Sequence, residues 1–247
     1  MHPGIKLVIA FYIALPLASG PAASAAPVDQ KELQQVLEQL NLAAENFHST
    51  SADVEFDTVQ TDPIYNKDIQ KGAVEYKRKG KEFQMAVHFL VEANGVEEGK
   101  PASFKPAPKD LTCSGGEAML YEKLTDQLYT RDFTKYESYL LLGFGASGTE
   151  LAEKWDIKYL GTEPLPDGRT SVKTVKLELV AKDPNVRNLY PKVTIWIDPA
   201  RAVSLKQVFD EGRGESRTSY YSNIKLNPAL PDSDFKIKTD SKTQIMK

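Results

Sequence analysis

Hydrophobic residues recur along this chain with two different periods. Between residues 30 and 47 they return every three or four positions, which is typical of an amphipathic helix. Asp29, with Glu32 three residues later, is the expected helix N-cap. Beyond the helix the period changes to two, as in 52–60 and 81–91. Such alternation predicts strands with one apolar and one solvated face, so the pattern indicates a β-rich body behind one helix.

Turn residues separate further alternating stretches, and the strands follow one another closely in the sequence. Strands are predicted at 52–60, 72–79, 81–91, 117–122, 127–133, 155–160, 171–181, 192–198, 202–210, 215–226 and, as a short last one, 234–238. Residues 92–112 contain prolines and glycines and are expected to form a long exposed loop. Close spacing favours an antiparallel meander, and a sheet of about ten strands should curl.

Two further segments are expected to cover the apolar face of this sheet. Residues 135–142 are mostly apolar, and a short helix is predicted at 149–154. Together with the N-terminal helix they favour an α+β fold, mainly antiparallel β, with a helical plug over one curled sheet.

The first 25 residues have the pattern of a secretory signal. A basic start precedes an apolar run from Leu7 to Leu17, and Ala23-Ser24-Ala25 fits the rule for cleavage. A membrane anchor is the alternative, but the run is short and Pro16 interrupts it. We therefore expect removal of residues 1–25, a single domain over 26–240, a C-terminal tail at 241–247, and export to the periplasm.

Composition narrows the chemistry. The 247 residues carry a net charge of -3, whereas nucleic-acid binding usually needs a basic excess. Cys113 is the single cysteine, which excludes an intrachain disulfide and a multi-cysteine zinc site, and three histidines leave little room for a histidine-rich one. No metal or cofactor is expected.

Candidate catalytic patterns are weak. Residues 143–148 match G-x-G-x-x-G, the dinucleotide fingerprint, but that motif belongs between a strand and a helix of a βαβ unit. A flexible glycine link is the preferred interpretation. No G-x-S-x-G elbow is present, and His48 and His88 are expected at boundaries or on the surface. Cys113 is expected to be a partly buried thiol. We therefore expect that the protein is not an enzyme. The apolar surface of the alternating strands favours a binding cavity.

The order of segments resembles a known family. An amphipathic helix is followed by "FDTVQ", "GAVEYKRKGKEF", "CSGGEAMLYEKLTDQLYTRDF", "YESYLLLGF", "WDIKYLG" and "VTIWIDPARAVSLKQVFDEGRGESRTSYYSNIKLNPALPDSDFKIK". This order, over about residues 30–238, is similar to the periplasmic outer-membrane lipoprotein carrier family, whose members are LolA-like. The resemblance implies an unclosed half-barrel of about ten to eleven strands, with a helical lid over an apolar cavity.

The resemblance also implies a function and partners. Proteins of this family carry acylated lipoproteins from an inner-membrane ABC transporter to an outer-membrane receptor. Their functional arginine matches Arg78, which would latch the lid. Lys79 stands where the family usually has proline, and the 92–112 segment is longer than expected. We expect a monomer without nucleic-acid partners.

Alternation places a set of apolar side chains on the cavity face. The candidate lining residues are Val54, Phe56, Phe83, Met85, Val87 and Phe89, with Leu140, Leu141 and Leu142 from the lid. Burying acyl chains there gains about 0.8 kcal/mol per CH₂. Two alternatives on the same fold remain open: a periplasmic sensor that binds a lipid or lipoprotein and regulates a membrane partner, and a shuttle for free lipids.

Overall fold

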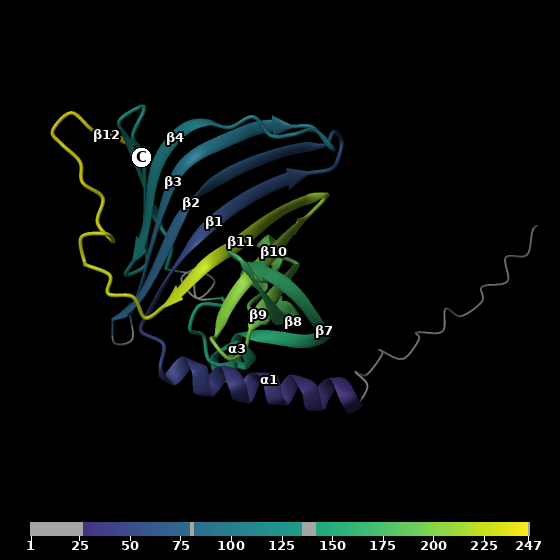
Figure 1. Ribbon diagram of the computed structural model, residues 1–247. Helices are drawn as coiled ribbons and strands as arrows, with labels where there is room; N and C mark the ends of the chain where they lie inside the picture. The colour runs from purple at the N-terminus through teal and green to yellow at the C-terminus, as the bar shows by residue number, and fades with distance from the viewer. Residues whose placement is uncertain (1–26, 80–81, 135–141, 247) are drawn as a thin grey trace, which may run out of the picture.

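The computed structural model describes residues 27–79, 82–134 and 142–246. Within them twelve strands form one sheet in the order β12-β6-β5-β4-β3-β2-β1-β11-β10-β9-β8-β7 (Figure 1). The strands are β1 (Ser49–Gln60), β2 (Asn66–Lys79), β3 (Glu82–Val96), β4 (Lys105–Ser114), β5 (Glu117–Glu122), β6 (Gln127–Asp132), β7 (Trp155–Asp167), β8 (Thr170–Ala181), β9 (Lys192–Asp198), β10 (Val203–Gly212), β11 (Glu215–Leu226) and β12 (Gln244–Met246). The helices are α1 (Pro27–Glu45), α3 (Gly148–Lys154) and α4 (Pro184–Leu189).

All neighbouring strands pair antiparallel except β12, which runs parallel to β6. The first and last long strands, β1 and β11, pair in the middle of the sheet. The sheet therefore has two wings on either side of this pair. The larger wing contains β1 to β6 in chain order, and the smaller wing contains β11 to β7 in reverse chain order. The sheet curls without closing, and α1 lies along one end of it (Figure 1). The predicted fold class is therefore confirmed.

Buried apolar residues form two clusters that follow the two wings. One cluster joins α1, through Leu40, to the inner face of β8 and β9, where Leu177 and Ile195 are fully buried. The other covers the concave face of β1 to β3, with contributions from β4, β10 and β11. The amphipathic helix predicted from the apolar period is confirmed as α1, and it packs with its apolar stripe on the smaller wing.

The prediction of a long exposed loop at 92–112 is wrong for most of these residues. Strand β3 continues to Val96 and β4 begins at Lys105, so the connection shrinks to 97–104. Pro106 lies opposite Val91, beside a register shift between Phe89 and Val91. Proline is tolerated in a strand at such irregularities because its missing N–H breaks no ladder hydrogen bond there.

Two boundaries also differ from the prediction. Helix α1 begins at Pro27, so Asp29 lies in its first turn and is not the N-cap. The last strand is β12 and not 234–238, where Phe235 is buried in irregular chain. The short helix predicted at 149–154 is confirmed as α3, which begins with a capping box between Ser147 and Glu150. No helix in the described part of the chain has the length and hydropathy needed to span a membrane.

Candidate functional site

The concave face of the sheet holds a cavity of about 540 Å³. This volume is within the range of 300–1,000 Å³ that is usual for small-molecule sites. The strands β1 to β6 supply one wall, and β10, β11 and the end of α4 supply the other. Its apolar lining consists of Phe56, Met85, Val87, Leu111, Cys113, Ala118, Phe133, Leu189, Tyr190 and Phe209, with the rings of Tyr76 and Tyr221. The cavity is therefore chiefly apolar.

The structure brings the strand residues predicted for the cavity into one place. Phe56, Met85 and Val87 line it. The other three, Val54, Phe83 and Phe89, are buried in the same cluster.

The residues predicted for the lid are placed differently. Leu142 is buried, but it belongs to the cluster around α1 and is not among the cavity-lining residues. Leu140 and Leu141 lie outside the described residues, as does most of the predicted lid.

An aromatic stack that the sequence did not reveal closes the floor of the concave face. Phe144 is fully buried and stacks on Tyr76 with ring centroids 4.1 Å apart. It also meets Tyr221 edge-on at 4.7 Å. Its only sequence signal is an aromatic residue between two glycines, and this pattern does not say which surface the ring will meet. Phe144 joins the 142–147 segment to the wall of the cavity.

The glycines of the G-x-G-x-x-G match serve close packing. A Cβ added at Gly145 would lie 2.2 Å from the ring of Phe47, and one at Gly148 would lie 2.2 Å from the carbonyl oxygen of Leu37. Gly143 and Gly145 also have positive φ values, which favour glycine. Because the surrounding sheet is antiparallel, the segment has no βαβ context for a dinucleotide, and its glycines are explained by close packing and not by a flexible link.

Polar groups on the cavity wall are hydrogen-bonded to one another. The hydroxyl of Tyr221 donates to Oε1 of Gln207 at 3.4 Å, and Nε2 of Gln207 donates to the carbonyl oxygen of Leu142. Burial raises the pKa of Tyr76 and of Tyr221 above the usual range of phenols. Both hydroxyls are therefore neutral at neutral pH, and this part of the wall carries no charge.

Arg78, the residue that the family resemblance marks as a latch, reaches the segment beyond the predicted lid. Its Nη2 donates to the carbonyl oxygen of Gly145 at 3.1 Å and lies 3.9 Å from Oε2 of Glu150. Its backbone N–H donates to the carbonyl oxygen of His48 at 2.8 Å. Arg78 thus ties β2 to Gly145, three residues after the end of the predicted lid, and its role as a latch stays a prediction.

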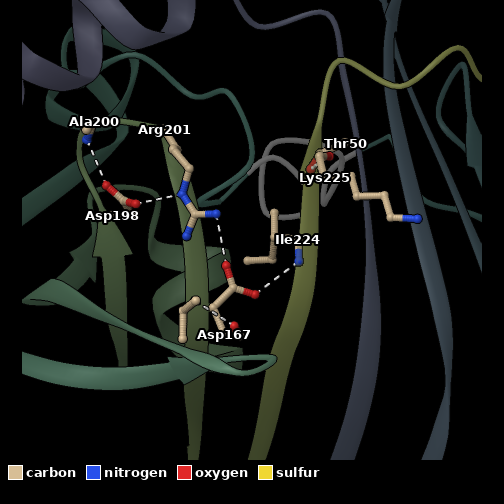
Figure 2. A network of polar contacts seen from close by, with 8 residues as sticks. Thr50, Asp167, Asp198, Ala200, Arg201, Ile224 and Lys225 are labelled. Atoms are coloured by element: carbon tan, nitrogen blue, oxygen red, sulfur yellow. Dashed lines mark hydrogen bonds and ion pairs between the residues drawn. The ribbon is translucent and has the colours of Figure 1, made fainter.

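A partly buried ionic clamp holds the turns of the smaller wing against β11 (Figure 2). Arg201 donates through Nε to Asp198 at 2.6 Å and through Nη1 to Asp167 at 2.9 Å. The second oxygen of Asp167 accepts the backbone N–H of Ile224 at 3.0 Å. Burial alone would lower the pKa of Arg201, but the two carboxylates raise it above its ordinary value. The clamp fixes the β7–β8 turn to the β9–β10 turn and to β11.

The helix at one edge of the cavity, α4, was not predicted from the sequence pattern. Helix α4 places Leu189 and Tyr190 at the cavity, and Tyr190 packs on Phe209 with centroids 5.1 Å apart. Asp183 caps this helix and Pro184 follows in its first turn, a pattern that marks helix starts.

In the described part of the chain, no group of three or more His, Cys, Asp or Glu side chains is placed to hold a metal ion.

Comparison with known proteins identifies the fold. Neither a protein-family model nor a curated protein matches the sequence. An uncharacterized conserved protein from Thermus thermophilus is similar over 87% of this chain and 98% of its own, at 16% identity and a TM-score of 0.50. A LolA superfamily protein from Nitrosomonas europaea is similar over 83% of this chain and 97% of its own, at 18% identity and a TM-score of 0.36.

A third similar structure is the MucA/MucB complex of Pseudomonas aeruginosa. Its matched chain aligns over 84% of this protein at 13% identity and a TM-score of 0.43. This protein spans only 61% of that chain. At such identities the likeness concerns the fold. The similar structures include a LolA superfamily protein, and the likeness to them shows the fold alone.

Proposed function

We propose that this protein is a periplasmic carrier that binds the acyl chains of lipoproteins and moves them from the inner to the outer membrane. The observation that supports the proposal is the apolar cavity of about 540 Å³ on the concave face of an unclosed sheet. Because each buried CH₂ gains about 0.8 kcal/mol, one acyl chain contributes several kcal/mol of binding free energy. Most of the residues that line the cavity are apolar, which suits acyl chains.

In this proposal the partners are an inner-membrane ABC transporter that loads the carrier and an outer-membrane receptor that unloads it. Arg78 holds the segment that starts at Gly145 close to β2. The 135–142 segment acts as a lid that competes with cargo for the same apolar surface. Such competition lowers the net affinity and permits release. The protein acts as a monomer and needs no cofactor.

Binding is tested with the purified chain and a diacylated lipopeptide, measured by native mass spectrometry. The same peptide without acyl chains is the negative control. We expect a complex of one lipopeptide with one chain. In Phe56→Gln an amide replaces a cavity-lining ring, and desolvating that amide costs about 1–3 kcal/mol, which weakens binding about tenfold or more. Leu124→Gln, at a side chain that is 72% exposed and outside the cavity, should bind normally.

Two results contradict the binding proposal. One is that the wild-type protein binds the acylated peptide and the peptide without acyl chains with similar affinity. The other is equal loss of affinity in the two variants, because that would place the acyl chains outside the concave cavity.

Transport is tested separately from binding. Inner-membrane vesicles that contain lipoproteins are energised with ATP and mixed with the purified protein. A soluble complex of lipoprotein and carrier is expected, and its addition to outer-membrane vesicles should transfer the lipoprotein. Lipoproteins that stay in the inner-membrane vesicles would refute the carrier role while leaving acyl binding intact.

A further inference from the structure

The charged side chains that line the cavity carry a net positive charge, whereas the whole chain carries a net negative charge. Three charged side chains line the cavity, namely Arg131, Asp132 and Arg217. Two of the three are arginines, although the chain carries a net charge of -3. The other lining residues are apolar or neutral polar. Arginine donors at the border of an apolar cavity are complementary to a ligand that is apolar at one end and anionic at the other.

The register of the strands places both arginines on the concave side. Arg131 of β6 lies opposite Ala118 of β5, and Ala118 lies opposite Cys113 of β4; all three line the cavity. Arg217 of β11 lies opposite Phe209 of β10, which also lines it. Five strands, β1 to β5, separate β6 from β11 in the sheet. The curl of the sheet therefore brings two arginines from distant strands to one cavity.

Each guanidinium keeps donors for a ligand. Nε of Arg217 forms an ion pair with Oε1 of Glu211 at 2.5 Å, and the Arg217 side chain is 55% exposed. Arg131 is exposed, and its Nη1 donates to the carbonyl oxygen of Thr130 at 3.3 Å. A guanidinium has five N–H donors, so these contacts use one donor of each. The acidic neighbour Asp132 accepts the backbone N–H of Thr134 at 2.9 Å.

We propose that the cavity also binds free anionic glycerophospholipid, with the acyl chains on its apolar floor and the phosphate at Arg131 and Arg217. Arginine suits this headgroup because its planar fork matches the two free oxygens of a phosphodiester. Leu189, which is 43% exposed at the end of α4, offers apolar surface at the same cavity for the start of an acyl chain. The inference rests on the proposed function only in that both need an acyl-binding cavity.

The test uses the purified chain and short-chain lipids that dissolve as monomers. Phosphatidylglycerol and phosphatidylcholine with identical acyl chains are compared by isothermal titration calorimetry, at low and at high salt. We expect phosphatidylglycerol to bind about tenfold more tightly at low salt and the preference to shrink at high salt, because screening weakens exposed ion pairs. The double variant Arg131→Gln/Arg217→Gln should lose the preference and keep the affinity for phosphatidylcholine.

A matched control removes the same charge elsewhere. Arg169 and Arg213 lie exposed in the β7–β8 and β10–β11 turns and do not line the cavity. The variant Arg169→Gln/Arg213→Gln should retain the full preference for phosphatidylglycerol. A preference that survives in Arg131→Gln/Arg217→Gln, or that disappears equally in the control, overturns the proposal.

Failure of this inference and failure of the carrier proposal give different results. Equal binding of the two lipids by the wild-type chain overturns headgroup recognition and leaves the acyl-binding cavity standing. Absence of binding by both lipids overturns the inference, and the diacylated lipopeptide then decides independently whether the cavity holds acyl chains at all.

Discussion

Removing one charge from the clamp around Arg201 should destabilise the whole fold. Asp167 is 8% exposed and accepts two hydrogen bonds, from Nη1 of Arg201 at 2.9 Å and from the backbone N–H of Ile224 at 3.0 Å. In Asp167→Asn one of the two carboxylate oxygens becomes an NH₂ group, which cannot accept a hydrogen bond. That NH₂ group must then face one of the two donors, either Arg201 or the backbone N–H of Ile224. A hydrogen bond to a charged group contributes about 1.5–3 kcal/mol. We therefore expect a loss of about 2–3 kcal/mol.

For a chain of this size, that loss corresponds to a fall in Tm of about 4–12 °C. Thermal unfolding followed by circular dichroism and urea unfolding both measure it. Arg201→Met should cost more, about 3–5 kcal/mol, because it leaves Asp167 and Asp198 buried without their cation. Asp156→Asn, at an exposed carboxylate on β7, is the control. If Asp167→Asn stays within about 0.5 kcal/mol of that control, the clamp does not hold the wing and the reasoning is wrong.

Three further predictions concern the cavity floor, the latch and the outer face. Gly145→Ala should cost about 2–4 kcal/mol in urea unfolding, because its Cβ would lie 2.2 Å from the ring of Phe47 at positive φ. Gly115→Ala, where a Cβ meets nothing within 4 Å, should cost clearly less, and equal losses would disprove the packing role. Arg78→Leu should fold normally but alter transfer of cargo to receptor-containing vesicles; unchanged transfer would remove Arg78 from the mechanism. Burial alone would raise the pKa of Asp110, but hydrogen bonds from a lysine and a histidine hold it below its ordinary value. The stability that Asp110 contributes is thus present at neutral pH and is lost as pH falls below about 4. Wild type should lose more stability than Asp110→Asn between about pH 5 and pH 3, and parallel losses would contradict this.

Elements with a strong and uninterrupted period could be predicted from the sequence. Helix α1 and strands such as β8 have regular apolar positions, and alternation placed Met85 and Val87 on the face that lines the cavity. Strand β4 was missed because Pro106 and its neighbouring prolines are typical of loops, whereas a register shift accommodates Pro106. The hydrophobic pattern of a segment indicates its secondary structure, but it does not show how neighbouring strands pair. It therefore cannot show that a register shift accommodates a proline in a strand.

The rest of the site depends on contacts between distant parts of the chain. Phe144 supports the cavity wall only because its segment meets Tyr76 and Tyr221, two residues that line the cavity. Arg201 and Asp167 form an ion pair across two turns that no local spacing connects. Such pairs follow from the curl of the sheet, which alternation along single strands does not describe.

The pairing of β1 with β11 has a consequence for folding kinetics. Thr50, near the start of β1, lies opposite Leu226, near the end of β11. The concave face therefore stays incomplete until nearly the whole chain is available, however early β1 to β6 pair. Closing such a long loop costs entropy before the contact is gained, and topologies rich in distant contacts fold slowly. The unfinished chain would expose the apolar face of its larger wing until β11 arrives, so formation of the β1–β11 ladder is expected to be a late step.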